Sequence, residues 1–269
     1  RLNRGLSDEF VSELLAGAMA PILAAARSRD LDFQIREDYV NLYHRGLSLL
    51  KLSQQRAGAY RAQIHVEYLR GVELPGETRR DEPHAVFAAD SAFAEAWAAQ
   101  LQAITANSDD HAHREAEAEQ ALVRNSLLPA SPLAIIDRQV QVHGIGKRAD
   151  VIGLTCEAEP RFVIAEVKRG LNNGIQKIPE QLAGYRRVLA GADGRLRDEC
   201  CNVYRRVVEQ KRRLGILPDS VVFPQGRPEV ECLAILCDYN PNSRLLDRAR
   251  RLAQGCGFTI RRVEPAAPD

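Results

Sequence analysis

Three strand-like runs in a row, separated only by short turn-like segments, constrain this chain more than any other feature. The runs are LAIIDRQVQV, RADVIGL and RFVIAEVK, within residues 133–168, and the segments between them are HGIGK and TCEAEP. Each run is rich in apolar and β-branched residues, whereas Gly, Pro and charged residues in the connecting segments are typical of turns. Because strands joined by short turns pair with opposite directions, the spacing predicts antiparallel hairpins.

Helical and strand patterns continue on both sides of these hairpins. Residues 111–128 have the composition of a helix, and further helices are expected at 174–190, 194–214 and 243–256. ECLAILCDY is a continuous apolar run typical of a buried strand, and FTIRRV predicts a last strand. The order from residue 111 is therefore αβββααβαβ. It predicts an α/β (α+β) fold class with a mixed sheet flanked by helices.

The first hundred residues predict a separate, small α+β domain. Residues 7–27 have apolar side chains at helical spacing, so one amphipathic helix is expected there, with Ser7 as its N-cap. A meander of about four short strands follows. Residues 71–84 collect Gly, Pro and charge, which predicts a surface loop or linker, and residues 86–106 return to helical composition.

Length and composition favour two domains in a cytoplasmic protein. The chain has 269 residues, of which 45% are hydrophobic, and we expect an N-terminal domain of unknown function over 1–108 and a second domain over 109–269. The sequence has no apolar stretch near the roughly 20 residues that cross a bilayer, and its first residues do not match a secretory leader. We therefore expect a cytoplasmic location and no membrane partner.

Cysteine spacing indicates the state of the thiols, and the charge distribution indicates the kind of partner. The six cysteines form no C-x-x-C unit and lie mostly in apolar or helical runs, which favours free, buried thiols. The net charge is only +1, but residues 137–215 hold 16 Lys and Arg against 10 Asp and Glu. This local excess favours an anionic partner for the second domain.

Two charged residues end an otherwise apolar strand candidate. In RFVIAEVK, strand alternation places Glu166 and Lys168 on one face with Phe162 and Ile164. A strand that is apolar on both faces is typical of the middle of a sheet, where charged groups carry a desolvation cost unless they bind something. The preceding strand carries Asp150, and hairpin pairing can bring it beside Glu166. The pattern predicts two converging carboxylates with a lysine next to them.

This group of residues suits a hard divalent cation. Mg²⁺ and Mn²⁺ are bound by oxygen ligands, typically one or two carboxylates together with water. Asp150, Glu166 and the backbone carbonyl of Val167 can supply the protein's share. Lys168 can orient or deprotonate a metal-activated water, or stabilise charge that develops on phosphorus.

The motif Ala-Asp150-(x)15-Glu166-Val-Lys168 resembles the signature of the PD-(D/E)XK phosphodiesterase superfamily, over about residues 111–262. The resemblance implies a restriction-endonuclease-like core in which Asp150, Glu166 and Lys168 are catalytic. Gln181 and Tyr185 form a Gln-x-x-x-Tyr element similar to that of RecB-like and CRISPR-associated exonucleases, where it contacts substrate near the site. The resemblance thus implies a catalytic role for Gln181 and substrate binding by Tyr185.

The resemblance also implies a further acidic ligand from the predicted helix before the hairpins. Glu115-(x)6-Leu122-(x)2-Asn125 resembles the helix that enters the nuclease domain of Shedu-type anti-phage proteins. Glu115 and Glu119 share a helix face with Leu122, so either of them is a candidate for the metal shell. The sequence departs from the family pattern at Ala149, which replaces the nominal proline, and in a long gap between Asp150 and Glu166.

Basic and aromatic clusters have two interpretations each. Arg169 and Arg186 are candidates for substrate binding, and the basic runs at 186–187, 205–206 and 211–213 are either phosphate contacts or solvated helix faces. The run QIREDYVNLYHRG in the first domain is either a packed hairpin with a polar face or a surface that reads a partner or a nucleic-acid base.

The function predicted from these observations is that of a Mg²⁺- or Mn²⁺-dependent nuclease. Its expected substrate is nucleic acid, DNA rather than RNA, and the resemblance suggests defence against foreign DNA or DNA repair. A homo-oligomer or a partner in a defence or repair complex is compatible with this function. The alternative is a catalytically silent, nuclease-like protein that binds nucleic acid or assembles a complex.

Overall fold

The computed structural model of this chain describes residues 3–28, 31–56, 58–111, 114–128, 131–141, 148–170, 176–189, 195–237, 240, 242–256 and 258–263. It divides into two compact units. The N-terminal unit comprises Asn3–Gln120 and Glu209–Asp219, and the C-terminal unit comprises Ala121–Val208 and Ser220–Asp269. Two helices, α4 (Arg114–Asn125) and α6 (Arg195–Arg213), carry residues of both units. The domain division expected from the sequence, at residue 108, stays a prediction.

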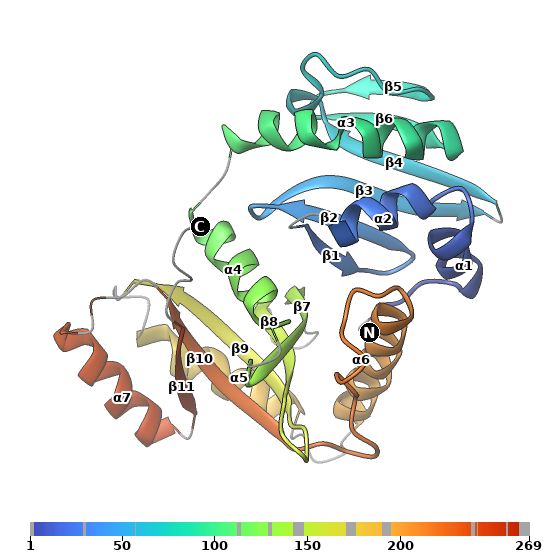
Figure 1. The fold of residues 1–269 in the computed structure, drawn as a ribbon. Coiled ribbons are helices and arrows are strands. Elements are labelled where there is room, and N and C mark those ends of the chain that lie inside the picture. Colours follow the sequence, from blue (N-terminus) through green and yellow to red (C-terminus); the bar gives the residue numbers. More distant parts are fainter. Residues whose placement is uncertain are drawn as a thin grey trace. The chain divides into compact units, whose positions relative to one another are not determined.

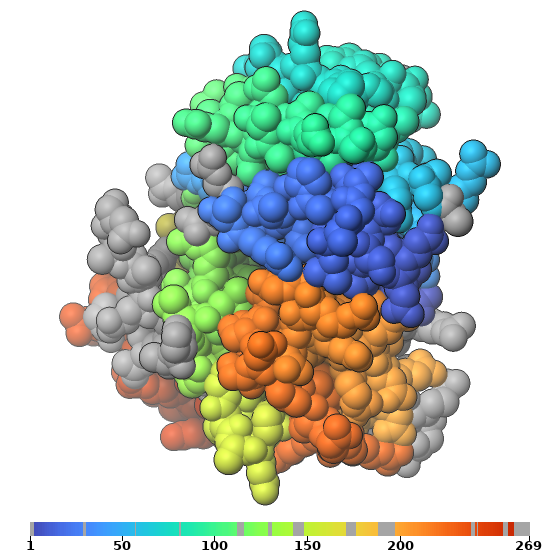
Figure 2. Space-filling view, turned by 45° about the vertical axis from the view of Figure 1, so that its right-hand side comes forward, coloured from blue at the N-terminus to red at the C-terminus, as the bar shows by residue number. Residues whose placement is uncertain are grey.

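The N-terminal unit is built on an antiparallel six-stranded sheet in the order β1-β2-β3-β4-β6-β5 (Figure 1). Its strands are β1 (Asp32–Ile35), β2 (Tyr39–His44), β3 (Leu47–Arg56), β4 (Ala59–His65), β5 (Glu77–Asp81) and β6 (His84–Ala89). Its other elements are α1 (Asp8–Ala16), α2 (Ala20–Ser28), the 3-10 turn η1 (Val66–Leu69) and α3 (Ser91–Asp109). Figure 2 shows α1, α2 and α3 forming much of the surface of this unit on one side. Large apolar side chains such as Phe10, Phe93 and Trp97 are fully buried in its core.

The single helix expected over 7–27 is wrong, because two helices occupy this stretch. Ser7 caps α1 as expected, with its hydroxyl accepting the N–H of Phe10 at 3.0 Å. Helix α1 ends where Glu13 accepts the N–H groups of Gly17 and Ala18 through its backbone and side-chain oxygens. Proline lacks an amide hydrogen and is tolerated only in the first turn of a helix, and the structure places Pro21 in the first turn of α2.

The meander of about four strands is present as β1 to β4, but the sheet continues into two further strands, so it has six in the described part of the unit. Residues 71–84, expected to be a loop, contain β5 and the start of β6. Strand β5 lies at the edge of the sheet and is rich in charge, with the sequence ETRRD. Charged side chains on an edge strand discourage pairing with other chains, and here they gave the strand the composition of a loop.

The C-terminal unit has the element order expected from residue 111 onward. Its mixed five-stranded sheet has the order β11-β10-β9-β8-β7, in which β7, β8 and β9 pair antiparallel and β9, β10 and β11 pair parallel. The strands are β7 (Leu133–Gln141), β8 (Arg148–Thr155), β9 (Phe162–Arg169), β10 (Val230–Cys237) and β11 (Thr259–Val263). The helices are α5 (Ile178–Leu189) and α7 (Arg244–Cys256), together with parts of α4 and α6. The prediction of an α+β chain whose mixed sheet is flanked by helices is confirmed.

Strand β9 is the middle strand, and its two faces have different neighbours. Val163, Ala165 and Val167 join a buried apolar cluster that includes Leu122 and Val123 of α4. On the opposite face the ring of Phe162 lies 5.6 Å from that of Tyr204 in α6, and α5 packs against β9 and β10. Alternation along β9 therefore directs Glu166 toward the face covered by α5 and α6.

Two further expectations concerned the burial of the cysteines and the absence of a membrane-spanning helix. Cys200, Cys201, Cys232 and Cys237 are buried thiols, as predicted, whereas the thiol of Cys156 is exposed. The exposure of Cys256 lies outside the described residues. Among the described helices, none is by itself long and apolar enough to cross a membrane; α1 and α2 reach that length and composition only as a pair, with a bend of 70° between them.

Candidate active site

Asp150, Glu166 and Lys168 come together on one face of the central hairpin. Val151 pairs with Ala165 in the antiparallel ladder, so the next residues outward on the two strands are Asp150 and Glu166. The Lys168 ammonium lies 3.2 Å from a carboxylate oxygen of Glu166 and 3.6 Å from one of Asp150. The convergence expected from strand alternation is therefore present in the fold.

The two carboxylates have different surroundings. Asp150 is partly exposed, and its Oδ2 accepts the backbone N–H of Val167 at 2.8 Å. The side chain of Glu166 is only 1% exposed. One carboxylate is thus partly exposed to solvent, while the other is enclosed by the protein.

Glu166 is held by two side chains of α5. The Tyr185 hydroxyl lies 2.8 Å from Glu166 Oε1, and the Gln181 amide donates to Glu166 Oε2 at 3.0 Å. The same hydroxyl is 2.7 Å from the backbone carbonyl of Arg148. Residues four apart on a helix share a face, which is why the Gln-x-x-x-Tyr spacing delivers both groups to one carboxylate.

The electrostatics of the site are dominated by the burial of Glu166. Burial, followed by the charge of Asp150, raises the pKa of the Glu166 carboxyl to about 7. The Lys168 charge and the Tyr185 hydrogen bond oppose this shift without cancelling it. Burial and the nearby Glu166 carboxylate also raise the pKa of the Tyr185 phenol, so Tyr185 stays a hydrogen-bond donor near neutral pH.

The other predicted site residues on and near these strands occupy varied positions. The Val167 carbonyl accepts the Lys168 ammonium at 3.0 Å, Arg169 is half-buried, and Arg186 is exposed on α5. Tyr185 has no exposed surface, so in this structure its hydroxyl supports Glu166. Direct contact of Tyr185, Arg169 or Arg186 with substrate stays a prediction.

The helix glutamates are placed differently from one another. The Glu119 side chain is 8% exposed and belongs to the N-terminal unit, and the Glu115 side chain lies outside the described residues. Glu117 forms an ion pair with Arg45. Within the described ranges, no three His, Cys, Asp or Glu side chains are gathered as a set of metal ligands. A third acidic ligand from α4 therefore stays a prediction.

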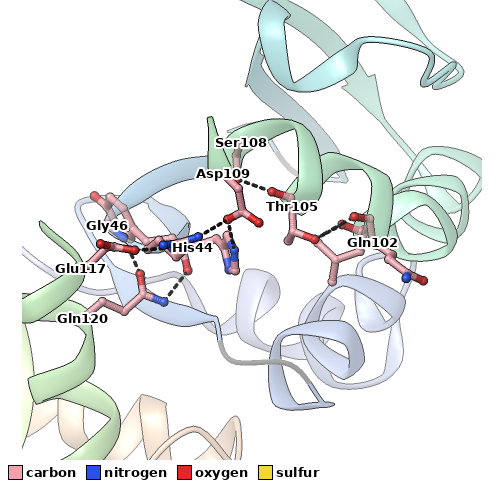
Figure 3. A network of polar contacts seen from close by, with 11 residues as sticks. His44, Gly46, Gln102, Thr105, Ser108, Asp109, Glu117 and Gln120 are labelled. Carbon is pink, nitrogen blue, oxygen red and sulfur yellow. Dashed lines mark hydrogen bonds and ion pairs between the residues drawn. The ribbon is translucent and has the colours of Figure 1, made fainter. Parts of the chain in front are cut away.

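The Arg45 ion pair belongs to a network at the tip of the β2–β3 hairpin (Figure 3). Arg45 and Gly46 form the turn with φ values of 48° and 83°, and Gln120 of α4 accepts the Gly46 N–H at 2.7 Å. Asp109 at the end of α3 lies 3.1 Å from both His44 and Arg45. Of the two interpretations of QIREDYVNLYHRG, these contacts favour the packed hairpin.

Two of the basic residues in α6 also have internal partners. The Arg205 guanidinium lies over the Phe223 ring at 5.3 Å and donates to the Gly226 carbonyl at 3.2 Å. Lys211 is buried and donates to Gln34 at 3.1 Å. Lys211 is therefore an internal residue, whereas Arg205 stays half-buried and a phosphate contact through it stays a prediction.

The donor chemistry of the site fits a divalent cation. Asp150 and Glu166 bring two carboxylates together against one lysine, and the charge of Asp150 adds to the burial that raises the pKa of Glu166. Hard cations take carboxylate oxygens and complete their shell with water. Asp150 and Glu166 would hold such an ion, with the partly exposed Asp150 leaving room for water.

One polar residue near this site was not identified from the sequence. Gln139 of β7 has its side-chain amide 3.5 Å from Asp150 Oδ1. Alternation along LAIIDRQVQV shows which residues share a face, but the strand contains a register shift between Ile135 and Asp137. Pairing with β8 therefore decided that Gln139 meets Asp150.

Comparisons with known proteins give only remote structural likenesses. No protein-family model matches the sequence, and no curated protein matches it. A structure of an EndoMS complex with double-stranded DNA has a TM-score of 0.32 and 12% identity, covering 98% of this chain and 97% of that one. A repair endonuclease from Pyrococcus abyssi also has a TM-score of 0.32 and 12% identity, covering 97% of each chain. At such TM-scores the likeness carries no argument about this chain.

Proposed function

We propose that this protein is a Mg²⁺- or Mn²⁺-dependent nuclease that hydrolyses phosphodiester bonds, in DNA rather than RNA. The observation that carries the proposal is the buried carboxylate of Glu166, braced by Gln181 and Tyr185 and set beside Asp150 and Lys168. A purely structural carboxylate gains nothing from a second carboxylate placed next to it, because the charge of Asp150 disfavours the ionised form of the buried Glu166. Such an arrangement is typical of a site that binds a cation.

The residues of the site divide the work of hydrolysis. A bound Mg²⁺ or Mn²⁺ ion would polarise the scissile phosphate and lower the pKa of a coordinated water. Asp150 and Glu166 hold the ion, while Gln181 and Tyr185 keep the Glu166 carboxylate in place. Lys168 presents a compact positive charge at the same point, where it stabilises negative charge that develops on phosphorus or directs the attacking water.

The setting of this activity is part of the proposal. Defence against foreign DNA or DNA repair, in the cytoplasm, is supported by the resemblance of the Asp150, Glu166 and Lys168 motif to the PD-(D/E)XK signature. Arg169 and Arg186, which belong to the same unit as the site, supply positive charge for the nucleic-acid backbone. A homo-oligomer or a complex with another defence or repair protein is compatible with these roles.

The direct test is cleavage of DNA by the full chain. Linear, circular and single-stranded DNA would be incubated with the protein and Mn²⁺, and products followed on gels. We expect cleavage by the wild type, and losses on the order of 100-fold or more in Lys168→Ala and Lys168→Arg, because a guanidinium differs from an ammonium in size and geometry. Lys177→Ala is the matched control, since Lys177 is an exposed lysine of the same unit. Cleavage that is unchanged in Lys168→Ala would refute the nuclease proposal.

The alternative is a catalytically silent protein of the same fold that binds nucleic acid or assembles a complex. It is favoured by the finding that no third acidic, His or Cys ligand joins Asp150 and Glu166 among the described residues. Titration calorimetry with Mn²⁺ separates the two functions. Binding that is lost in Asp150→Ala supports the nuclease, and an absence of Mn²⁺ binding to the wild type supports the silent protein.

A further inference from the structure

Gln139 stands opposite Asp150 across the β7–β8 ladder. Arg138 pairs with Val151 and Val140 pairs with Ala149, so Gln139 falls beside Asp150 between these two pairs. Directly opposed residues of an antiparallel pair project to the same face of the sheet. Gln139, Asp150 and Glu166 therefore form a polar row across three neighbouring strands.

The backbone of Gln139 has an unusual conformation for a strand. Its φ is 52°, in the left-handed region, although the residue carries a side chain and the ladder stays paired on both sides. The neighbouring Arg138 and Val140 are buried, whereas Gln139 is only half-buried. A non-glycine residue in this region is strained, and such residues concentrate at functional sites where the surrounding structure enforces them.

The two oxygens of Asp150 are held unequally. Oδ2 accepts the Val167 N–H at 2.8 Å and lies 3.6 Å from Lys168. Oδ1 faces the Gln139 amide at the longer distance of 3.5 Å. Oδ1 is thus the oxygen better placed to bind a cation, and a carboxylate oxygen has lone pairs for both a metal and one amide donor. Hydrogen bonds at catalytic sites are often long before the ligands bind and shorten afterwards.

We infer that Gln139 is a positioning residue for Asp150, and that its amide orients Oδ1 toward the divalent cation. The inference rests on the proposed nuclease function. Hydrogen bonds to a ligating carboxylate fix its direction, and their loss typically lowers metal affinity by about 10- to 100-fold. The strained backbone places the amide, and the amide in turn places the carboxylate oxygen.

Mn²⁺ affinity of full-length variants, measured by calorimetry, tests this role. Gln139→Gly removes the side-chain amide, and glycine adopts a positive φ without strain. We therefore expect a folded protein that is at least as stable as the wild type. Its Mn²⁺ affinity should fall roughly 10-fold. Gln139→Asn keeps an amide and tolerates a positive φ, and it should recover part of the affinity. Gln141→Gly is the matched control, because Gln141 is exposed on the same strand.

A second measurement separates positioning from a merely structural effect. DNA cleavage by Gln139→Gly should return toward the wild-type rate when Mn²⁺ is raised above its weakened dissociation constant, whereas structural damage would not respond to the metal. Wild-type Mn²⁺ affinity in Gln139→Gly, or an equal loss in Gln141→Gly, would overturn the role of Gln139 and leave the proposed function intact. A wild type that neither binds Mn²⁺ nor cleaves DNA would overturn both.

Discussion

The Tyr185 hydroxyl has one proton and two acceptors, the Glu166 carboxylate and the Arg148 carbonyl. One side chain of α5 thus lies against β8 and β9 together, although its single proton is donated to only one of the two oxygens at a time. This placement also explains why a tyrosine without exposed surface belongs to the site: it sets the position and the charge of a carboxylate that the proposed cation needs.

Removing this hydroxyl tests its contribution. Tyr185→Phe removes the one hydroxyl proton that Glu166 Oε1 and the Arg148 carbonyl share, so we expect a loss of about 1–2 kcal/mol in the free energy of unfolding. The matched control is Tyr60→Phe, because the Tyr60 hydroxyl is buried without a hydrogen-bond partner in the described part of the chain. Urea unfolding of both variants gives the comparison, and equal losses would contradict the role of the Tyr185 hydroxyl.

The raised pKa of Glu166 predicts how the stability of the metal-free protein depends on pH. This pKa is about 7 in the folded protein against an ordinary value of 4.5. Between these values the unfolded chain has released a proton that the folded protein retains, so stability falls as pH rises from 4.5 to 7 and then levels off. The fall contributed by this group is up to about 3 kcal/mol.

The measurement is urea unfolding in a chelator at pH 5, 6, 7 and 8. Glu166→Gln cannot titrate, so its stability should fall less over this range than that of the wild type. The comparison concerns the slope and does not depend on how stable the variant is at any single pH. Equal slopes in the two proteins would show that Glu166 is not the group responsible.

At the scale of elements, the site depends on close pairing of β7, β8 and β9. Gly153 of β8 allows this approach, because a Cβ atom there would lie 2.7 Å from the Ala134 carbonyl oxygen and 3.1 Å from a methyl group of Leu133. The first distance is shorter than real Cβ contacts and involves backbone, which cannot easily move aside.

Gly153→Ala should therefore destabilise the C-terminal sheet. We expect a loss of about 1–3 kcal/mol from overpacking, with a smaller Mn²⁺ affinity because β8 also carries Asp150. Urea unfolding monitored by circular dichroism, together with Mn²⁺ titration, provides the measurement. A variant with wild-type stability would mean that β7 and β8 separate at this point at little cost.

The element order of the C-terminal unit follows from local pattern, whereas two features of the N-terminal unit do not. Apolar runs such as that of β10 are unambiguous because they are long and bounded by turn residues. Strand β5 has no apolar alternation, and only its pairing with β6 makes it a strand. The break after α1 depends on Glu13 and Pro21, two local signals that the helical periodicity of residues 7–27 concealed.

At the scale of the whole molecule, helices α4 and α6 affect how cooperatively the protein unfolds. Because α4 and α6 each carry residues of both units, unfolding of either unit removes support from a helix of the other. Trp97, the single tryptophan, is fully buried in the N-terminal unit, so its fluorescence reports on that unit alone. We expect its urea midpoint to coincide with that of far-ultraviolet circular dichroism, as in a single cooperative transition. Two separate midpoints would show that the units unfold independently.

The sequence by itself determined the order of elements along the C-terminal unit, the hairpins of its first three strands, and the shared face of Glu166 and Lys168. All three depend only on local spacing, since a strand alternates its faces every residue and a hairpin joins neighbours in the chain. The Gln181 and Tyr185 pair was likewise visible as one helical turn, although its contact with Glu166 was not.

Only the tertiary structure decided which partners these residues meet. Glu166 contacts Gln181 and Tyr185, and Gln139 contacts Asp150. These contacts join residues that are 11 to 19 positions apart in the sequence. Such contacts depend on strand register and on how α5 packs across the sheet, and a local pattern does not specify either. The raised pKa of Glu166 has the same origin, because desolvation is set by everything that surrounds the carboxylate once the chain has folded.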